Sequence, residues 1–539
     1  MKGQKSQAII GLALLAILLL FSYLSHTLSP KHPHKIYVML TFDTEDFITP
    51  ETNDVLKSLV EILNRHGLRG EFYVVSEKMR VLVNDYPGIL GLLKMGRHVI
   101  GYHQNCHSVH PTIAEYSNVR DWEAAVETAY LYETRRINVY TGELRANESG
   151  GIAYMREVLG TTPISFRPPG YVWSPALVYV LRSLGVRVFS LSSAFRAITG
   201  EDLNWYMGVL QVPAGDLYMD GYLVRGDLQG LKGAFSKLCE GGGEHKLVVL
   251  ALHPCMLVTT KFWDFNYYHG RNPGSPEQVS LPPLRSREDV WTALRTFEEF
   301  LEYLESLENV EVVTSEDLLE LVEETAGVTV TKGELAELAS QVISSSTLPN
   351  YLRTCRGHYL TLAETYLVLA KAALSYLRSG ELPSSVKLSV EEHLVLGPVE
   401  YFSNKGKLIN LTAGLLEHVF SEALRASRER GYIPAVITAG GYRLSAADVL
   451  YLSAYTIWSA GQGGLPRFVA FTGREVLPPS AHDLEISYSW PCLPRGEDFS
   501  VELLRARLQL WTLKPASLRT RPSSLKPLWG TCRTPRASP

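Results

Sequence analysis

Four segments carry side chains whose types and spacing could do chemistry. In FDTED, Asp43, Glu45 and Asp46 directly follow an apolar run. Because side chains alternate along a strand, Asp43 and Glu45 are expected on one face, and Asp46 lies just past the strand end. Crowded carboxylates repel one another, and a divalent metal with a nearby base would use them together. The alternative is a solvated acidic turn.

Two histidines in HVIGYHQNCHSVHP favour the metal interpretation. His103 and His107 are separated by three residues. That spacing places two imidazoles on one side of a helical turn, which is a common two-histidine metal arrangement. His110, directly before Pro111, is a rival for the second histidine ligand.

An arginine and a further histidine stand at the ends of two later apolar segments. Arg167 in FRPPGY could orient a carboxylate base through a bidentate pair, or it could be a surface residue in a Pro-rich turn. His253 ends the apolar stretch VVLALHP, where it is well placed as a general acid. The alternative for His253 is a hydrogen-bonded core histidine.

The elements that must position these residues alternate along the chain. Residues 35–325 read as strands alternating with helices, which predicts an α/β fold with a parallel sheet, in the form of a barrel. In such barrels the chemistry lies at the C-terminal ends of the strands. Residues 264–287 are rich in Gly, Pro, Asn and Ser and predict a long surface loop at the edge of the site.

These segments, in this order, resemble the polysaccharide deacetylase family, also called the NodB-homology or carbohydrate esterase 4 family. TFDTEDF resembles the first motif in its D-V-E-D variant, HVIGYHQNCH the second, FRPPGY the third and LALHP the last. The resemblance covers residues 35–325. It implies a distorted (β/α) barrel of NodB type and a divalent metal, usually zinc.

The resemblance also implies a role for each matching residue. Asp43 matches the catalytic base, Arg167 the arginine that orients the base, and His253 the general acid. His103 and His107 match the metal histidines.

Two positions of the family pattern stay open. Thr44 stands where the family has its metal aspartate, so the metal carboxylate is Glu45, favoured by strand geometry, or Asp46. The fourth motif, an aspartate that tunes the general acid, has Asp216 and Asp220 as candidates.

The N-terminus predicts a membrane anchor. Lys2 and Lys5 precede an uncharged apolar run at residues 8–25, long enough to cross a hydrocarbon core. The preceding lysines predict a cytoplasmic tip and a body outside the cell membrane. The alternative is a cleaved signal peptide and a secreted protein. The net charge of −4 argues against a nucleic-acid partner.

The C-terminal part contains an internal repeat. Residues 348–374 parallel residues 433–457, with LTLAE at 360 matching LSAAD at 444, an offset of 84. The short extended segments 380–388 and 463–471 match at an offset of 83. The two units resemble the pseudomurein-binding repeats of archaeal surface proteins, which implies attachment to a surface glycan and an archaeal source.

The sequence therefore predicts an α/β barrel, an N-terminal transmembrane helix and mixed α/β tandem repeats. The expected boundaries are 1–34 for tip, anchor and linker, 35–325 for the catalytic barrel, 326–347 for a linker, 348–430 and 431–513 for the repeats, and 514–539 for a basic disordered tail.

The expected function is a metal-dependent hydrolase that removes N-acetyl groups from amino-sugar glycans of the cell envelope. One alternative is a metal-dependent hydrolase of another non-peptide C–N bond. The other is a non-catalytic protein that binds a surface glycan.

Overall fold

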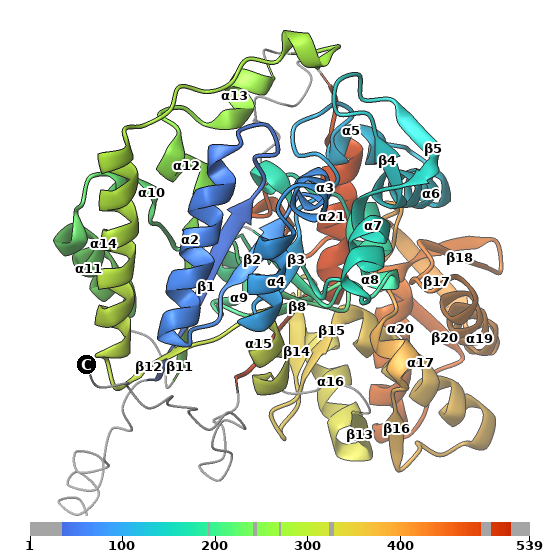
Figure 1. The fold of residues 1–539 in the computed structure, drawn as a ribbon. Helices are drawn as coiled ribbons and strands as arrows, with labels where there is room; N and C mark the ends of the chain where they lie inside the picture. Colours follow the sequence, from blue (N-terminus) through green and yellow to red (C-terminus); the bar gives the residue numbers. More distant parts are fainter. Residues whose placement is uncertain are drawn as a thin grey trace, which may run out of the picture.

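The computed structural model describes residues 35–191, 194–240, 245–268, 271–322, 328–486 and 497–518. An α/β domain reaches to residue 322, and a helix-rich repeat module occupies residues 328–486 (Figure 1). The last described segment, 497–518, runs back along both parts.

One curled sheet of 11 strands forms the centre of the α/β domain. Its order is β10-β11-β1-β2-β3-β6-β7-β9-β8-β21, with β12 also paired to β1. The central pairs are parallel, whereas β8 and β21 pair antiparallel at one end. The parallel α/β prediction is confirmed, but β10 and β21 stand at opposite ends of the order, so the described sheet curls without closing.

The strands of this sheet are β1 (Lys35–Thr44), β2 (Glu71–Val74), β3 (Val99–Tyr102), β6 (Ser165–Phe166), β7 (Val188–Leu191), β8 (Asn204–Tyr206), β9 (Val209–Pro213), β10 (Leu217–Tyr218), β11 (His245–Leu252), β12 (Val310–Val312) and β21 (Lys514–Pro515). A separate hairpin joins β4 (Arg135–Ile137) to β5 (Leu144–Ser149).

Helices cover the outside of the sheet, with α2 and α14 side by side (Figure 1). They are α2 (Glu51–His66), α3 (Ser76–Asn84), α4 (Pro87–Met95), α5 (Ile113–Ser117), α6 (Trp122–Thr134), α7 (Gly151–Leu159), α8 (Pro175–Ser183), α9 (Ala194–Thr199), α10 (Asp220–Val224), α11 (Leu228–Cys239), α12 (Pro254–Val258), α13 (Trp263–Tyr267), α14 (Arg287–Glu305) and α15 (Ser315–Leu321).

Side chains along β1 alternate between the two faces of the sheet, and this alternation determines which of them reach the site. Val38, Leu40 and Phe42 lie in the core under the outer helices. Tyr37 and Met39 belong to the separate core on the inner side of the sheet. Since side chains alternate along a strand, Thr41 and Asp43 continue the inner row. An apolar strand therefore ends with polar groups aimed inward.

The repeat module consists of two units with the same order of elements. The first contains β13 (Thr329–Thr331), α16 (Lys332–Ser344), β14 (Tyr351–Arg353), β15 (Tyr359–Thr361), α17 (Leu362–Ser379) and β16 (Ser385–Lys387). The second contains β17 (Leu408–Thr412), α19 (Ala413–Arg430), β18 (Val436–Ala439), β19 (Tyr442–Ser445), α20 (Ala446–Gly461) and β20 (Phe468–Thr472). The short helix α18 (Val390–His393) lies between them.

The two units show their relation at the start of their second helices. Thr361 and Glu364 form a capping box on α17, and Ser445 and Asp448 form one on α20, 84 residues later. In each unit the first strand pairs antiparallel with the last, β13 with β16 and β17 with β20. The helices pack reciprocally, α16 on α20 and α17 on α19.

These strand pairings show that the first repeat unit begins earlier in the chain than its predicted boundary at residue 348. The segment 326–347, predicted as a linker, holds β13 and α16, which belong to the core of the module. The local similarity begins only at 348 and 433. The pairing of β13 with β16 and of β17 with β20 joins residues far apart in sequence, which local similarity does not reveal.

The segment 497–518 connects the module to the α/β domain through α21 (Ser500–Leu508), the 3₁₀ turn η4 (Gln509–Thr512) and β21. Trp511 donates a hydrogen bond to the carbonyl of Val476, and Lys514 lies buried against Glu364. Val322 and Leu518 form an antiparallel bridge. Residues 514–518, which were predicted as the start of a disordered tail, are ordered, and residues 519–539 lie outside the described part.

Within the ranges that the structure describes, no helix is both long enough and apolar enough to cross a membrane. The predicted anchor at residues 8–25 lies outside those ranges.

Candidate active site

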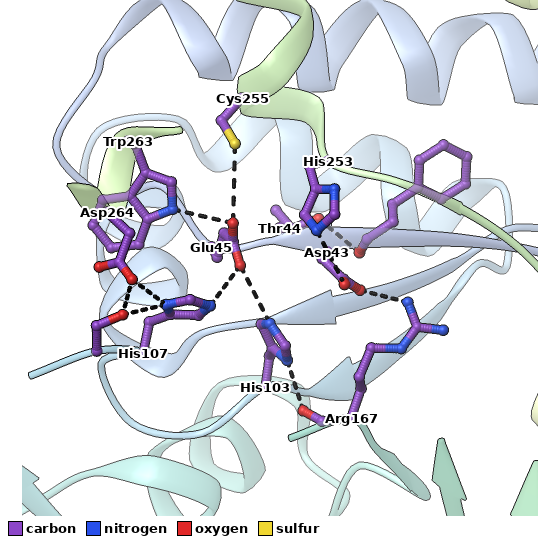
Figure 2. Close-up of polar contacts among 12 residues, drawn as sticks. Asp43, Thr44, Glu45, His103, His107, Arg167, His253, Cys255, Trp263 and Asp264 are labelled. Carbon is purple, nitrogen blue, oxygen red and sulfur yellow. Dashed lines mark hydrogen bonds and ion pairs between the residues drawn. The ribbon is translucent and has the colours of Figure 1, made fainter. Parts of the chain in front are cut away.

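The predicted chemical residues meet at the C-terminal ends of β1, β3, β6 and β11 (Figure 2). They form two neighbouring groups. The metal cluster consists of Glu45, His103 and His107. The acid–base cluster consists of Asp43, Arg167, His253 and Asp220.

The metal cluster offers three ligand atoms that all lie within 4.8 Å of one another. Glu45 Oε2 is 3.3 Å from His103 Nε2 and 2.8 Å from His107 Nε2. All three residues are buried. Two imidazole nitrogens and one carboxylate oxygen form the donor set of a catalytic zinc-type site.

The two histidines converge for a different reason from the one predicted. The residues after β3 form a loop and not a helical turn. Gln104 and His107 both have left-handed backbone angles, with φ of 67° and 57°. The tight loop, and not helical periodicity, brings His107 back beside His103.

Arg167 contacts Asp43, although through one nitrogen and not through the bidentate pair that the sequence suggested. Arg167 Nη1 donates to Asp43 Oδ1 at 2.6 Å, and its other nitrogens donate to Thr41 and Ser190. The guanidinium also lies over the ring of Tyr73, 4.3 Å from its centroid. Arg167 is fully buried, so it is a fixed positive charge that keeps Asp43 in one orientation.

His253 links Asp43 to Asp220. Its Nε2 lies 3.6 Å from Asp43 Oδ2, and its Nδ1 lies 3.2 Å from Asp220 Oδ1. The backbone N–H of His253 also donates to Asp220 Oδ1, at 2.8 Å. Burial lowers the pKa of His253, but the negative charge and hydrogen bond of Asp220, with Glu45 and Asp43, raise it to about 9.

Two aspartates, Asp216 and Asp220, were candidates for the residue that raises the pKa of His253, and the structure brings only one of them into contact with it. Asp220, at the start of α10, makes the contact. Asp216 instead accepts a hydrogen bond from the backbone of Val249 and pairs with Arg196.

Two other candidates lie away from the metal cluster. Asp46 Oδ1 accepts hydrogen bonds from the backbone N–H groups of Ile48 and Thr49, at 3.0 and 2.9 Å. Its carboxylate therefore stabilises the turn before α2, and the prediction of Asp46 as a metal ligand is not supported by its position. His110 points to Glu115, 2.6 Å away, and His107 takes the position for which His110 was a rival.

The charges in the metal cluster fit a divalent cation. Burial raises the pKa of Glu45, but His107 and His103 lower it far below its usual range. Burial lowers the pKa of His107, whereas Glu45 and Asp264 raise it to about 10. These shifts favour an ionised Glu45 beside a positive charge, and a divalent cation that binds the same atoms would also supply that charge.

Sequence reasoning missed three residues around the metal cluster. Trp263 Nε1 donates to Glu45 Oε1 at 3.1 Å, and Cys255 Sγ lies 4.0 Å from the same oxygen. Asp264 Oδ2 lies 3.2 Å from His107 Nδ1. Residues 263–267 form α13, although 264–287 were predicted to be a loop. The stretch FWDFNYY, an aspartate among aromatic residues, is the signal that could have indicated a buried element.

Residues 31–189 match the family model described as polysaccharide deacetylase. The matched stretch is less than half of the chain. It contains the whole metal cluster together with Asp43 and Arg167, and it ends before Asp220 and His253. The match indicates a hydrolase that acts on the N-acetyl C–N bonds of polysaccharides, which confirms the enzyme class predicted from the sequence.

Several solved structures are similar to this chain. The 4-alpha-glucanotransferase from Thermococcus litoralis is 14% identical over 53% of this chain and 40% of its own, with a TM-score of 0.32. PuuE allantoinase is 13% identical over 54% and 90%, with a TM-score of 0.32. A family 4 acetyl xylan esterase from Clostridium thermocellum, in complex with a cobalt ion, is 17% identical over 53% and 91%, with a TM-score of 0.26. A search of curated protein sequences found no match.

Proposed function

We propose that this protein is a metal-dependent deacetylase that removes N-acetyl groups from amino-sugar glycans of the cell envelope. The observation that carries the proposal is the meeting of the metal cluster and the acid–base cluster at the end of one strand. Asp43 and Glu45, two residues apart, each enter a different cluster. A site that only binds a glycan has no need for both.

The metal cluster would hold a divalent metal through Glu45, His103 and His107, and the two-nitrogen, one-oxygen donor set favours zinc. When bound, the metal supplies Lewis-acid activation of the water and of the acetamide carbonyl.

The acid–base cluster moves the protons. Asp43 Oδ1 is occupied by Arg167, so Oδ2 is the oxygen that accepts a proton from the attacking water. His253 is an imidazolium at neutral pH because Asp220 raises its pKa to about 9. Its Nε2–H donates a proton to the departing amine, which leaves acetate and a free amino sugar as products.

The cell-envelope assignment rests on the sequence outside the α/β domain. The apolar run at 8–25 supports an anchored protein whose body lies outside the cell. The repeat module would attach the enzyme to a surface glycan. The substrate would then be the polymer to which the enzyme is already attached.

The test is an acetate-release assay on the full-length chain with chitooligosaccharides and with cell-envelope fragments. Metal content is measured in parallel by elemental analysis. We expect acetate release that is lost on treatment with a chelator and restored by one divalent metal. Hydrolysis of a cyclic imide without acetate release from any glycan would favour the other C–N hydrolase. Glycan binding without hydrolysis of either substrate would favour the non-catalytic alternative.

A further inference from the structure

The short helix α13 lies directly against the metal cluster, although the proposed chemistry assigns it no role. It follows β11 and α12, so the chain that supplies His253 continues past the metal cluster. Trp263 is fully buried and Asp264 is 3% exposed. The indole of Trp263 packs in a small apolar core with Phe47 and Tyr267, and the polar groups of both Trp263 and Asp264 are aimed at the metal cluster (Figure 2).

Trp263 determines which oxygen of Glu45 faces the histidines. Its indole Nε1–H donates to Oε1 at 3.1 Å, and the thiol of Cys255 lies on the same oxygen. Oε2 is the atom that approaches both imidazoles, at 3.3 and 2.8 Å. A carboxylate held in this way turns Oε2 toward both histidines, so Oε2 is the oxygen that it would offer to a cation.

Asp264 determines the orientation of His107. Its Oδ2 lies 3.2 Å from His107 Nδ1 and also accepts a hydrogen bond from the hydroxyl of Ser108. A proton on Nδ1 that is donated to Asp264 makes Nε2, on the side of Glu45, the nitrogen that would bind a metal. His103 is fixed by a neutral group instead, since its Nδ1 lies 2.6 Å from the carbonyl oxygen of Arg167. The two histidines are therefore unequal donors.

We infer that Trp263 and Asp264 are positioning residues for the metal cluster: Trp263 keeps Glu45 a one-oxygen ligand, and Asp264 fixes His107 as the stronger of the two imidazole donors. The inference rests on the metal site of the proposed function. It concerns how this chain shapes that site, and it does not depend on which glycan is the substrate.

The test measures metal binding without substrate. In the full-length chain, Asp264→Asn keeps the size of the side chain but removes its charge. We expect its dissociation constant for Zn²⁺, measured against a chromophoric chelator, to rise about 10- to 100-fold. Trp263→Phe keeps the aromatic ring and removes the N–H. We expect the visible absorption of its Co²⁺ form to weaken and shift, because Glu45 can then bind through both oxygens.

Trp291→Phe is the matched control, because Trp291 lies on α14 and is 59% exposed. Its Zn²⁺ affinity and Co²⁺ spectrum should equal those of the unmodified chain. The split between kcat and KM gives a second readout: Trp263→Phe and Asp264→Asn should lower kcat and leave KM unchanged, since both residues are buried behind Glu45 and His107.

Two outcomes overturn the inference in distinguishable ways. If both variants bind Zn²⁺ as tightly as the unmodified chain and give its Co²⁺ spectrum, the positioning role is wrong while the proposed deacetylase stands. If the unmodified chain binds no divalent metal, the proposed function and this inference both fail.

Discussion

The metal cluster and the acid–base cluster begin two residues apart on the same strand end, yet they are constructed differently. In the metal cluster, three ligand atoms point at one another, and each residue is held from behind by a further group. In the acid–base cluster, the members bind one another in a chain from Arg167 through Asp43 and His253 to Asp220. The first is arranged around a cation, whereas the second is arranged to pass protons. Loss of a member should therefore have different effects in the two clusters.

The largest effect is expected in the metal cluster. His103→Ala or His107→Ala removes one of three ligands, and we expect metal content and acetate release to fall together to background. Elemental analysis and the acetate assay measure the two quantities. Deacetylation that survives without bound metal would contradict both the site and the mechanism.

Asp43→Asn should impair the acid–base cluster and leave metal binding by the metal cluster intact. The amide keeps the shape of the side chain but cannot accept a proton from water, so we expect kcat to fall about 100- to 10,000-fold. Bound metal should stay at the level of the unmodified chain, because Asp43 is not a ligand. A parallel loss of metal would show that the division between the clusters is wrong.

Asp220→Asn should change the pH profile more than the rate at its optimum. His253 must be protonated to act as an acid, so activity is expected to decline as pH rises through its pKa of about 9. The positive charge of a cation bound in the metal cluster lowers the pKa of His253 somewhat from that value. Without the charge of Asp220 the pKa falls, the alkaline limb moves to lower pH, and activity at pH 8 drops about tenfold. An unmoved limb in the pH dependence of kcat would exclude Asp220 as the group that tunes His253.

Asp46→Asn should have the smallest effect, although Asp46 lies next to Glu45. The amide oxygen can still accept the hydrogen bonds from Ile48 and Thr49. We expect metal content and the pH profile to stay unchanged, while the free energy of unfolding falls because buried Lys78 loses the negative charge that faces it. Loss of metal in this variant would return Asp46 to the metal cluster, and elemental analysis is again the measurement.

The sequence predicted those parts of the site that depend on local periodicity. The alternation of β1 placed Asp43 on the inner face, with Glu45 directly after the end of the strand, and the apolar runs placed Arg167 and His253 at the ends of β6 and β11. The convergence of His103 and His107 was predicted for the wrong reason, because left-handed backbone angles at single residues leave no periodic pattern.

The contacts that escaped prediction join segments far apart in the chain. Trp263 lies 218 residues from Glu45 in sequence, and Asp264 lies 157 from His107. Nothing near either residue indicates its partner. The repeat is another example. The sequence shows that two segments are similar at an offset of 84 residues, but where each unit begins and ends depends on the pairing of β13 with β16 and of β17 with β20.

The bridge between Val322 and Leu518 has a consequence for how the module can move. The chain leaves the α/β domain at one edge of its sheet and returns beside the same place through β21. Residues of the module also belong to the hydrophobic core of the α/β domain, among them Leu396, Val399 and Leu484. This shared core and the two adjacent chain crossings together hold the module in one orientation against the α/β domain. If the module binds a polymer, the site therefore meets that polymer always from the same side.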